Sequence, residues 1–493
     1  MTDGVFENLL ELGYSIYRDL NFHGLLMLQI DSKQKVNIRL NHSLIQESKP
    51  YHHSPNILFM CKKTLQSILP LFFAIILFSC EESVSPNDSG SSSDERPNIL
   101  LIISDDMGKD ATAGFSEGTL KPATPHLNEF KTNGLTFNNF WVNPTCSPTR
   151  SSIITGKYGY RTGVKNAGDV LSSSETILQK YINEQTDNAY ATAIVGKWHL
   201  SGASSTFNPE TFGLDYYKGL ITGTAADYYS WTMTEDGSTQ TETEYITTKF
   251  TDLAIDWVKE QDKPWFLWLA YTAPHTPFHV PPTGTHSQGN LPTYVAGLNE
   301  EPYYMAAIES MDFQIGRLLD NIPQDELDNT IIIYLGDNGT PRQVAQAPYD
   351  RNKVKGSLYQ GGINTPLIIS GKGVSRLGTD QNLVNGTDLF ATISSLAGAS
   401  TSEIHDSKSI VPLLSSNTTH RDFQYSEISE TTSDIWTIRN DQYKLIVMPN
   451  GTDEMYDLVA DPYENVNLLT STLSTEATTA KQSLEAELAV IRN

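Results

Sequence analysis

The sequence predicts an α/β protein with a large, mainly parallel sheet sandwiched by helices and a smaller C-terminal antiparallel α+β domain. Two observations support this prediction. Nearly continuous apolar runs of strand length alternate with helical patterns, as expected where parallel strands are buried on both faces. After about residue 415 this alternation gives way to short strand-like segments joined by the turn dipeptide Asn450-Gly451. A hydrophobic content of 39% is enough for a packed core.

The same patterns assign the individual elements in chain order. The expected strands of the main sheet are residues 98–103, 190–195, 265–270, 330–335 and 366–369. The expected helices are residues 125–132, 148–155, 247–259 and 303–321. In the C-terminal domain we expect strands at 434–439 and 443–448 and a helix over 474–491.

The first 95 residues differ from the rest of the chain. Residues 60–80 have a basic start, an apolar run and the ending Leu77-Phe78-Ser79-Cys80, which is typical of a bacterial lipoprotein signal. A transmembrane anchor is the alternative, but the run is shorter than the roughly 20 apolar residues that a bilayer requires. We therefore expect a doubtful N-terminal extension (1–59), a signal (60–80), a flexible tether (81–95), a main domain (96–414) and a C-terminal domain (415–493).

This organisation predicts an exported protein, lipid-anchored through Cys80 in a bacterial periplasm or outer membrane, that meets the membrane only through its lipid. If Cys61 leaves with the signal, Cys146 is the one remaining thiol and has no disulfide partner. The net charge is −24, from 34 Lys and Arg against 58 Asp and Glu. Nucleic acid is excluded as a partner, because phosphate binding needs a basic surface.

Polar clusters follow four of the expected strands. They are Ser104-Asp105-Asp106, Gly196-Lys197-Trp198-His199, Ala273-Pro274-His275 and Gly336-Asp337-Asn338-Gly339. Each cluster taken alone can be explained as an ordinary capped loop. Because parallel strands end at the same edge of a sheet, where α/β proteins bind ligands, four such clusters together predict a functional site.

The carboxylates of this set predict a metal. Asp105, Asp106 and Asp337, with Asn338, offer only oxygen ligands. Carboxylates that converge without a cation repel one another. Ca²⁺ prefers an all-oxygen shell, and Mg²⁺ is the alternative. Helix capping would also explain the Asp105-Asp106 pair.

Cys146 is expected just before the N-terminus of a helix. Pro148 suits the first helical turn, and Gly156 suits the far end. The unpaired N–H groups and the helix dipole favour an anion at this position. Arg150, one turn further on, can point back toward the same anion.

These residues resemble the type I sulfatase family of the alkaline-phosphatase-like superfamily. Cys146-Ser147-Pro148-Thr149-Arg150 matches its Cys-x-Pro-x-Arg signature, and the resemblance extends in the family's order over roughly residues 96–470. The other matching blocks are residues 96–106, 196–199, Pro274-His275-Thr276-Pro277, 336–339, 355–362 with Gln360 where Glu is usual, 455–458 and Asp461-Pro462.

The resemblance implies a mechanism. In such sulfatases a maturation enzyme oxidises the signature cysteine, here Cys146, to formylglycine. One hydroxyl of the hydrated aldehyde attacks sulfur, and the other later expels sulfate. A plain thiol would instead be trapped after one attack, which explains the need for the modification.

The resemblance also implies a role for each residue. Asp105, Asp106, Asp337 and Asn338 would hold Ca²⁺, with residue 146 touching it. Arg150 would orient residue 146, Lys197 and Lys355 would bind sulfate, His275 would protonate the leaving alcohol, and His199 would assist sulfate release. Lys355 is chosen over Lys353 because the family's lysine directly precedes a glycine, and Lys353 is expected to be solvated.

Export and family together predict action on sulfated poly- or oligosaccharides. The loops over residues 207–244 and 279–301 would select the sugar, with Tyr228, Tyr229 and Trp231 either stacking on it or packing inside the protein. Three alternatives remain open. They are a formylglycine-dependent phosphonate monoester hydrolase or phosphodiesterase, a non-catalytic lipoprotein that binds sulfated glycans, and a structural scaffold.

Overall fold

The computed structural model describes residues 26–30, 36–40, 96–202, 209–235, 237–430 and 433–493. The chain divides into two compact units, Met1–Ser91 and Ser92–Asn493. In the first unit, β1 (Leu26–Ile30) pairs with β2 (Val36–Leu40) in antiparallel fashion. The expected signal, Cys61, Cys80 and the tether lie outside the described residues and stay predictions. Among the described helices, none combines the length and apolar character needed to cross a membrane.

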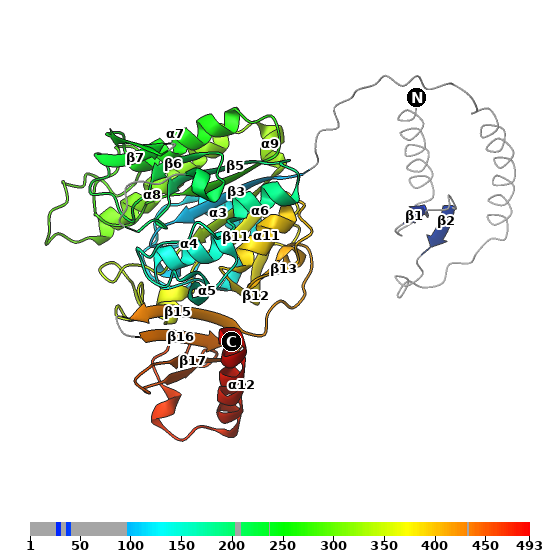
Figure 1. Ribbon diagram of the computed structural model, residues 1–493, viewed down its shortest axis with the longest axis vertical. Helices are drawn as coiled ribbons and strands as arrows, with labels where there is room; N and C mark the ends of the chain where they lie inside the picture. The colour runs from blue at the N-terminus through cyan, green and yellow to red at the C-terminus, as the bar shows by residue number, and fades with distance from the viewer. Residues whose placement is uncertain (1–25, 31–35, 41–95, 203–208, 236, 431–432) are drawn as a thin grey trace, which may run out of the picture. The chain divides into compact units, whose positions relative to one another are not determined.

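The second unit is built on a ten-stranded sheet with the order β12-β4-β11-β10-β3-β9-β5-β6-β7-β8 (Figure 1). Its strands are β3 (Asn98–Ser104), β4 (Gly134–Trp141), β5 (Ala191–Lys197), β6 (Tyr217–Leu220), β7 (Trp231–Glu235), β8 (Ser238–Glu242), β9 (Trp265–Ala270), β10 (Thr330–Gly336), β11 (Leu367–Gly371) and β12 (Gly378–Asn385). The centre, β10-β3-β9-β5-β6, is parallel throughout, whereas β11, β7 and β8 run antiparallel to their neighbours. The predicted, mainly parallel sheet is confirmed.

Helices cover both faces of this sheet. Along β3, Ile99, Leu101 and Ile103 belong to one hydrophobic cluster, and Leu100 and Ile102 belong to another. The first cluster includes side chains of α4 (Cys146–Thr155), α6 (Leu178–Gln185) and α11 (Asp388–Leu396). The second includes side chains of α3 (Pro125–Thr132), α7 (Ile246–Lys259) and α8 (Glu301–Asp320). Because both faces are buried, the central strands have continuous rather than alternating apolar sequences.

The expected and observed elements differ in informative places. α3 and β9 have the expected bounds, but α4 begins at Cys146, two residues before the expected start. Pro148 is the third helical residue, where its missing N–H has no helical acceptor to lose. Cys146 therefore opens the helix instead of preceding it. The sequence patterns also missed β4 and the edge strand β12, whose residues are partly polar and partly exposed.

The C-terminal part forms a second, antiparallel sheet of β15 (Gln424–Glu430), β16 (Ser433–Arg439), β17 (Tyr443–Val447) and β18 (Glu454–Asp457). The helix α12 (Thr475–Arg492) packs its Leu484 and Leu488 against Ile438 and Leu445 of this sheet (orange to red in Figure 1). The Ser474 side chain caps the helix by accepting from Ala477 N at 3.1 Å. The predicted antiparallel α+β region is confirmed.

One buried carboxylate ties α11 to the segments that lead into this second sheet. Asp388, the first residue of α11, accepts from Arg421 Nε at 3.0 and 2.9 Å and lies 3.1 Å from His420 Nε2. It also accepts from the backbone N–H groups of Asn385 and Lys408 at 2.9 Å each. Burial alone would raise the pKa of Asp388, but Arg421 outweighs it and lowers the pKa to about 2.

We expect Asp388→Asn to lower the free energy of unfolding by roughly 3–5 kcal/mol at pH 7, because Arg421 loses its buried partner. The pKa of Asp388 in the folded state, about 2, lies below the unfolded value of roughly 3.9. The stabilisation is therefore present above the unfolded value and is lost as the pH falls toward 2. Urea unfolding at pH values from 7 to 3 measures this. The difference in the free energy of unfolding between wild type and Asp388→Asn should become smaller below pH 4. Asp328→Asn, at an exposed carboxylate, is the control, and a pH-independent difference would contradict the prediction.

Candidate active site

The predicted polar clusters meet at one edge of the main sheet. β3, β10, β9 and β5 are neighbours and parallel, so the residues that follow them lie side by side. Two backbone hydrogen bonds continue the sheet beyond the strand ends, from Asp337 N to Ser104 O at 3.0 Å and from Asp105 N to Ala273 O at 3.1 Å. The edge is the one at which α/β proteins bind ligands.

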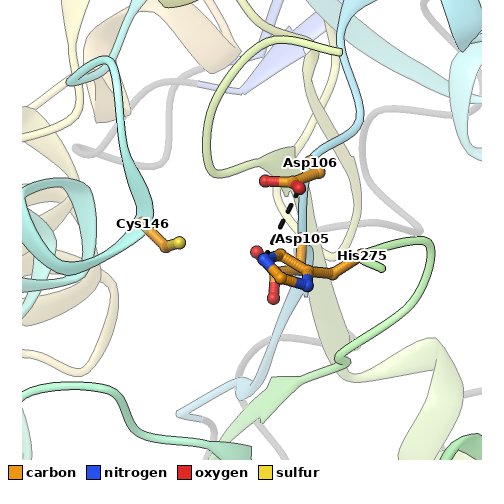
Figure 2. Close-up of side chains that lie close together, drawn as sticks. All are labelled: Asp105, Asp106, Cys146 and His275. Atoms are coloured by element: carbon orange, nitrogen blue, oxygen red, sulfur yellow. Dashed lines mark ion pairs between the residues drawn. The ribbon is translucent and has the colours of Figure 1, made fainter. Parts of the chain in front are cut away.

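Four side chains form the centre of this site. The potential ligand atoms of Asp105, Asp106, Cys146 and His275 all lie within 4.8 Å of one another. Figure 2 shows Cys146 pointing from the start of α4 toward the two carboxylates and the imidazole. His275 Nε2 lies 3.7 Å from Asp106 Oδ2. In the sequence, only the family resemblance predicts that Cys146 lies near these carboxylates.

Two lysines bring positive charge to the carboxylates. Lys197, at the end of β5, is fully buried, forms an ion pair with Asp105 and lies 3.5 Å from Cys146 Sγ. Lys355 Nζ lies 2.5 Å from Asp106 Oδ2, and its side chain is 24% exposed. Lys355, the lysine chosen from the sequence, therefore lies at the centre of the site.

Lys353 is not solvated as expected. Its ammonium donates to Glu464 O and lies 4.5 Å from the centre of the Tyr359 ring. A close backbone approach joins the segment after Asn338 to the segment after Lys355, where Gly339 N donates to Gly362 O at 2.9 Å. A Cβ on Gly339 would lie 1.8 Å from Gly361 O, so only glycine fits there.

Arg150 binds Asp337, and its expected approach to residue 146 stays a prediction. Its Nε and Nη2 donate to Asp337 Oδ2 at 3.1 and 2.8 Å, and its Nη1 donates to Lys197 O at 2.9 Å. Both side chains are buried. The guanidinium thus balances a carboxylate and holds the start of α4 near the ends of β5 and β10.

Asp106 has an unusual backbone conformation with φ of 70°. Such a value is uncommon for residues other than glycine and persists only where the surroundings hold it. Asp106 N donates to Asp337 Oδ1 at 3.1 Å, and Asn338 Nδ2 donates to Asp106 Oδ1 at 2.8 Å. The Tyr304 hydroxyl of α8 donates to Asp106 O at 2.7 Å. No local sequence signal marked Tyr304, because only the fold brings α8 to the site.

The donor set fits a hard divalent cation. Asp105 Oδ1 and Asn338 Oδ1 are buried and have no hydrogen-bond partner, which is unusual for buried oxygens. Carboxylate and amide oxygens are the ligands that Ca²⁺ and Mg²⁺ prefer. Asp337 is already engaged by Arg150 and Asp106 N, so its direct ligation of a metal stays a prediction.

Burial and charge set the ionisation of the site. Burial raises the pKa of the Cys146 thiol to about 12 despite the nearby Lys197, so the unmodified residue is a neutral thiol. Burial and the neighbouring Asp105 raise the pKa of Asp337 to about 7. For Asp105, burial would raise the pKa, but the Lys197 ammonium outweighs it and holds the pKa well below its usual range.

His199 lies beside this centre in a neutral form. Burial and the nearby Lys197 lower the pKa of His199 to about 2, and its Nδ1 is buried without a hydrogen-bond partner. The residue has φ of 57°. A Cβ on Gly223 would lie 2.2 Å from His199 Nε2, so the backbone at Gly223 packs directly on the imidazole.

The segment after Gly223 also supports His275. The Tyr228 hydroxyl donates to His275 O at 2.7 Å, and the Thr224 hydroxyl donates to Thr276 O at 3.0 Å. Tyr228 and Trp231 are buried in the hydrophobic core, so of the two alternatives for these aromatics they pack inside the protein. Tyr229, 40% exposed, keeps a free face.

Comparison with known proteins now identifies this arrangement. A family profile described as "Sulfatase" matches residues 97–399, which include every predicted site residue. The chain belongs to the sulfatase family. The resemblance found in the sequence is thereby confirmed. A second profile, described as "N-sulphoglucosamine sulphohydrolase, C-terminal", matches residues 352–493.

Individual sulfatases show how far the similarity extends. The uncharacterized sulfatase YdeN of Escherichia coli (strain K12) is 28% identical over 358 residues, which cover 60% of this chain and 62% of YdeN. The match thus spans less than two thirds of that relative. Among solved structures, Ps i-CgsB in complex with k-i-k-neocarrahexaose has a TM-score of 0.65 and 22% identity, covering 79% of this chain and 92% of that chain. BT4656 in complex with D-Glucosamine-2-N, 6-O-disulfate has a TM-score of 0.67 and 22% identity, covering 80% and 98%.

We expect millimolar Ca²⁺ to raise the Tm of the full chain, because a divalent cation would satisfy the unpartnered oxygens of Asp105 and Asn338. Asp105→Asn removes one charged ligand at almost constant volume and should weaken Ca²⁺ binding roughly tenfold or more. The measurement is thermal unfolding across a Ca²⁺ titration, with Mg²⁺ in parallel. Asp328→Asn, at an exposed carboxylate of α9 (Gln324–Asp328), should respond like wild type. An unchanged response of Asp105→Asn would place the cation elsewhere.

Proposed function

We propose that this protein hydrolyses sulfate esters of carbohydrates, using residue 146 as formylglycine together with a bound Ca²⁺ or Mg²⁺. One observation carries the proposal. Cys146, the first residue of α4, lies among Asp105, Asp106 and His275 and 3.5 Å from Lys197 Nζ. The residue that a maturation enzyme would oxidise is therefore also the residue at the centre of the charged cluster.

The charge of the centre suits an anionic ester. Three carboxylates, Asp105, Asp106 and Asp337, face three cations, Lys197, Lys355 and Arg150. A divalent cation would make this balanced centre positive, although the chain carries a net charge of −24. Bound there, the cation would polarise a sulfate oxygen and lower the pKa of an attacking hydroxyl.

Lys197 and Lys355 would bind the sulfate oxygens and stabilise the charge that develops during attack. Residue 146, as hydrated formylglycine, would carry two hydroxyls, one to attack sulfur and one whose deprotonation expels sulfate. His199, whose buried Nδ1 has no hydrogen-bond partner, would assist this release of sulfate, as the family resemblance implies. Asp337 lies between Arg150 and Asp106 and supports the geometry of both.

His275 is placed to protonate the leaving alcohol. Its Nδ1 lies 2.6 Å from Thr276 O and can only donate to that carbonyl. The other ring nitrogen, Nε2, therefore faces Asp106 and the reacting group. When both ring nitrogens carry a proton, Nε2 can deliver its proton to the leaving oxygen, which is general acid catalysis.

A sulfated sugar is the substrate class that we propose. Ps i-CgsB was solved with k-i-k-neocarrahexaose, and the BT4656 structure contains D-Glucosamine-2-N, 6-O-disulfate as that protein's substrate. Both share this fold and support a carbohydrate ester over other sulfate esters. The exposed Tyr229, whose hydroxyl donates to Val280 O in the segment after His275, offers an aromatic ring to a sugar.

The decisive test is sulfate release from a panel of sulfated oligosaccharides after co-expression with a formylglycine-forming maturase. Mass spectrometry first verifies the modification of Cys146. We expect release by the wild type and a loss of at least a thousandfold in Cys146→Ala, because the variant has no nucleophile. No release by verified, Ca²⁺-loaded protein would sink the proposal. Turnover of matched aryl phosphonates would then favour the phosphonate or phosphodiester alternative.

Tyr228→Phe should impair His275 selectively. The variant loses the hydroxyl that donates to His275 O at 2.7 Å while the ring stays packed. We expect kcat/KM to fall about tenfold for sugar sulfates, whose alcohols need a proton, and less than about threefold for aryl sulfates with good leaving groups. Tyr229→Phe is the matched control, since its hydroxyl donates to Val280 O. Equal losses on both substrates would show a general structural defect.

A further inference from the structure

A polar cavity lies where the main sheet meets the C-terminal sheet. It has a volume of about 240 Å³, and its lining includes Asn138 and Asn139 of β4, Arg439 of β16, Lys109 and Gln360. None of these residues belongs to the catalytic centre described above. The cavity holds several times the roughly 30 Å³ that one water occupies in the liquid.

Two buried cations line this cavity without a carboxylate partner. Lys109 is 1% exposed, and its Nζ donates to the backbone of Asn138 at 2.5 Å. Arg439 is 4% exposed, and its three nitrogens donate to Asn440 O, Asn139 Oδ1 and Asp441 O at 2.8, 3.2 and 2.9 Å. All four acceptors are neutral. A buried charge without a counter-charge is costly.

The neighbouring strand shows the usual solution. Lys444 lies directly opposite Arg439 in the β16–β17 pairing and is also fully buried. Its ammonium forms an ion pair with Glu464. Within the described part of the chain, no such pair is formed by Lys109 or Arg439. The two acidic residues that line the cavity, Glu117 and Asp441, are partly or fully exposed. Glu117 attracts Lys109 and Asp441 attracts Arg439 from a distance, but neither forms an ion pair with these cations.

A third group in the lining also lacks a partner. Gln360 is 4% exposed, and its Nε2 is buried without a hydrogen-bond acceptor. Its Oε1 is used, since Asn364 Nδ2 donates to it at 2.8 Å. The cavity thus presents two cations without an ion-pair partner and an unused amide donor, against one unused acceptor, Asn364 Oδ1. This surplus of donors suits a negatively charged acceptor.

We infer that this cavity binds a small inorganic oxyanion of the size of sulfate or phosphate, held by Lys109, Arg439 and Gln360. The inference is independent of the proposed catalytic function, because it uses other residues. Burial lowers the pKa of Lys109 to about 8 and that of Arg439 to about 10. A bound anion would offset this effect.

Thermal unfolding of the full chain tests the inference, with sulfate, phosphate and chloride compared at equal ionic strength. We expect sulfate and phosphate to raise Tm by about 2–4 °C more than chloride. Gln360→Glu would place a fixed carboxylate beside the cations. It should raise Tm in chloride and abolish the gain from the oxyanions. Gln482→Glu adds the same charge on the exposed face of α12 and should keep the gain.

Two further variants make each outcome decisive. Lys355→Gln weakens anion binding at the catalytic centre only, and the gain should survive in it. Arg439→Gln removes one cation of the cavity and should lose most of the increase in Tm that sulfate and phosphate cause. This variant tests the inference even if Gln360→Glu does not fold. An equal effect of chloride, or a gain that persists in Arg439→Gln and disappears in Lys355→Gln, would overturn the inference.

Discussion

Three carboxylates buried at one sheet edge, Asp105, Asp106 and Asp337, impose the constraint to which the rest of the site responds. Parallel strands place them there, because β3 and β10 are neighbours and end together. At such short separations like charges repel strongly in a protein interior. Each carboxylate is accordingly paired with a cation from another element, Lys197 from β5, Lys355 from the loop after β10 and Arg150 from α4. The ion pairs that neutralise the site thus also join four parts of the fold.

The same arrangement would allow an acidic protein to act on the anionic substrate that we propose. The overall charge of −24 would repel a sulfate ester at long range. Inside the site the balance is local and close to neutral before any cation binds. The unpartnered oxygens of Asp105 and Asn338 leave room in the ligand set for a divalent cation. Substrate affinity would therefore depend on the bound metal.

Buried polar groups without a partner support both proposed binding sites, with opposite sign. At the catalytic centre the surplus is in oxygen ligands and suits a cation. At the junction of the two sheets it is in Lys109 and Arg439 and suits an anion. In both places a buried polar group lacks a partner, which is costly.

Much of the fold and site was predictable from the sequence because the signals are local. Apolar runs predicted the central strands, and the Cys146 signature predicted the family. Positions directly after the predicted strands identified the candidate site residues Asp105, Asp106, Lys197, His275 and Asn338. A run of apolar residues reports burial on both faces, and a polar cluster after it reports the strand end. The strands β4 and β12 escaped this reasoning because polar residues interrupt their apolar sequences, Asn138-Asn139 in β4 and Asp380-Gln381-Asn382 in β12.

Only the tertiary structure decided which residues face one another. Arg150 lies on the expected helix but pairs with Asp337, because α4 crosses the ends of β5 and β10. Tyr304, Thr224 and Tyr228 come from distant segments without any motif, and their hydroxyls meet Asp106 O and the His275 loop only after folding. The cavity beside Gln360 likewise exists only where two sheets meet. Local patterns determine which elements form, whereas partners far apart in the chain are decided by packing, which no short stretch of sequence encodes.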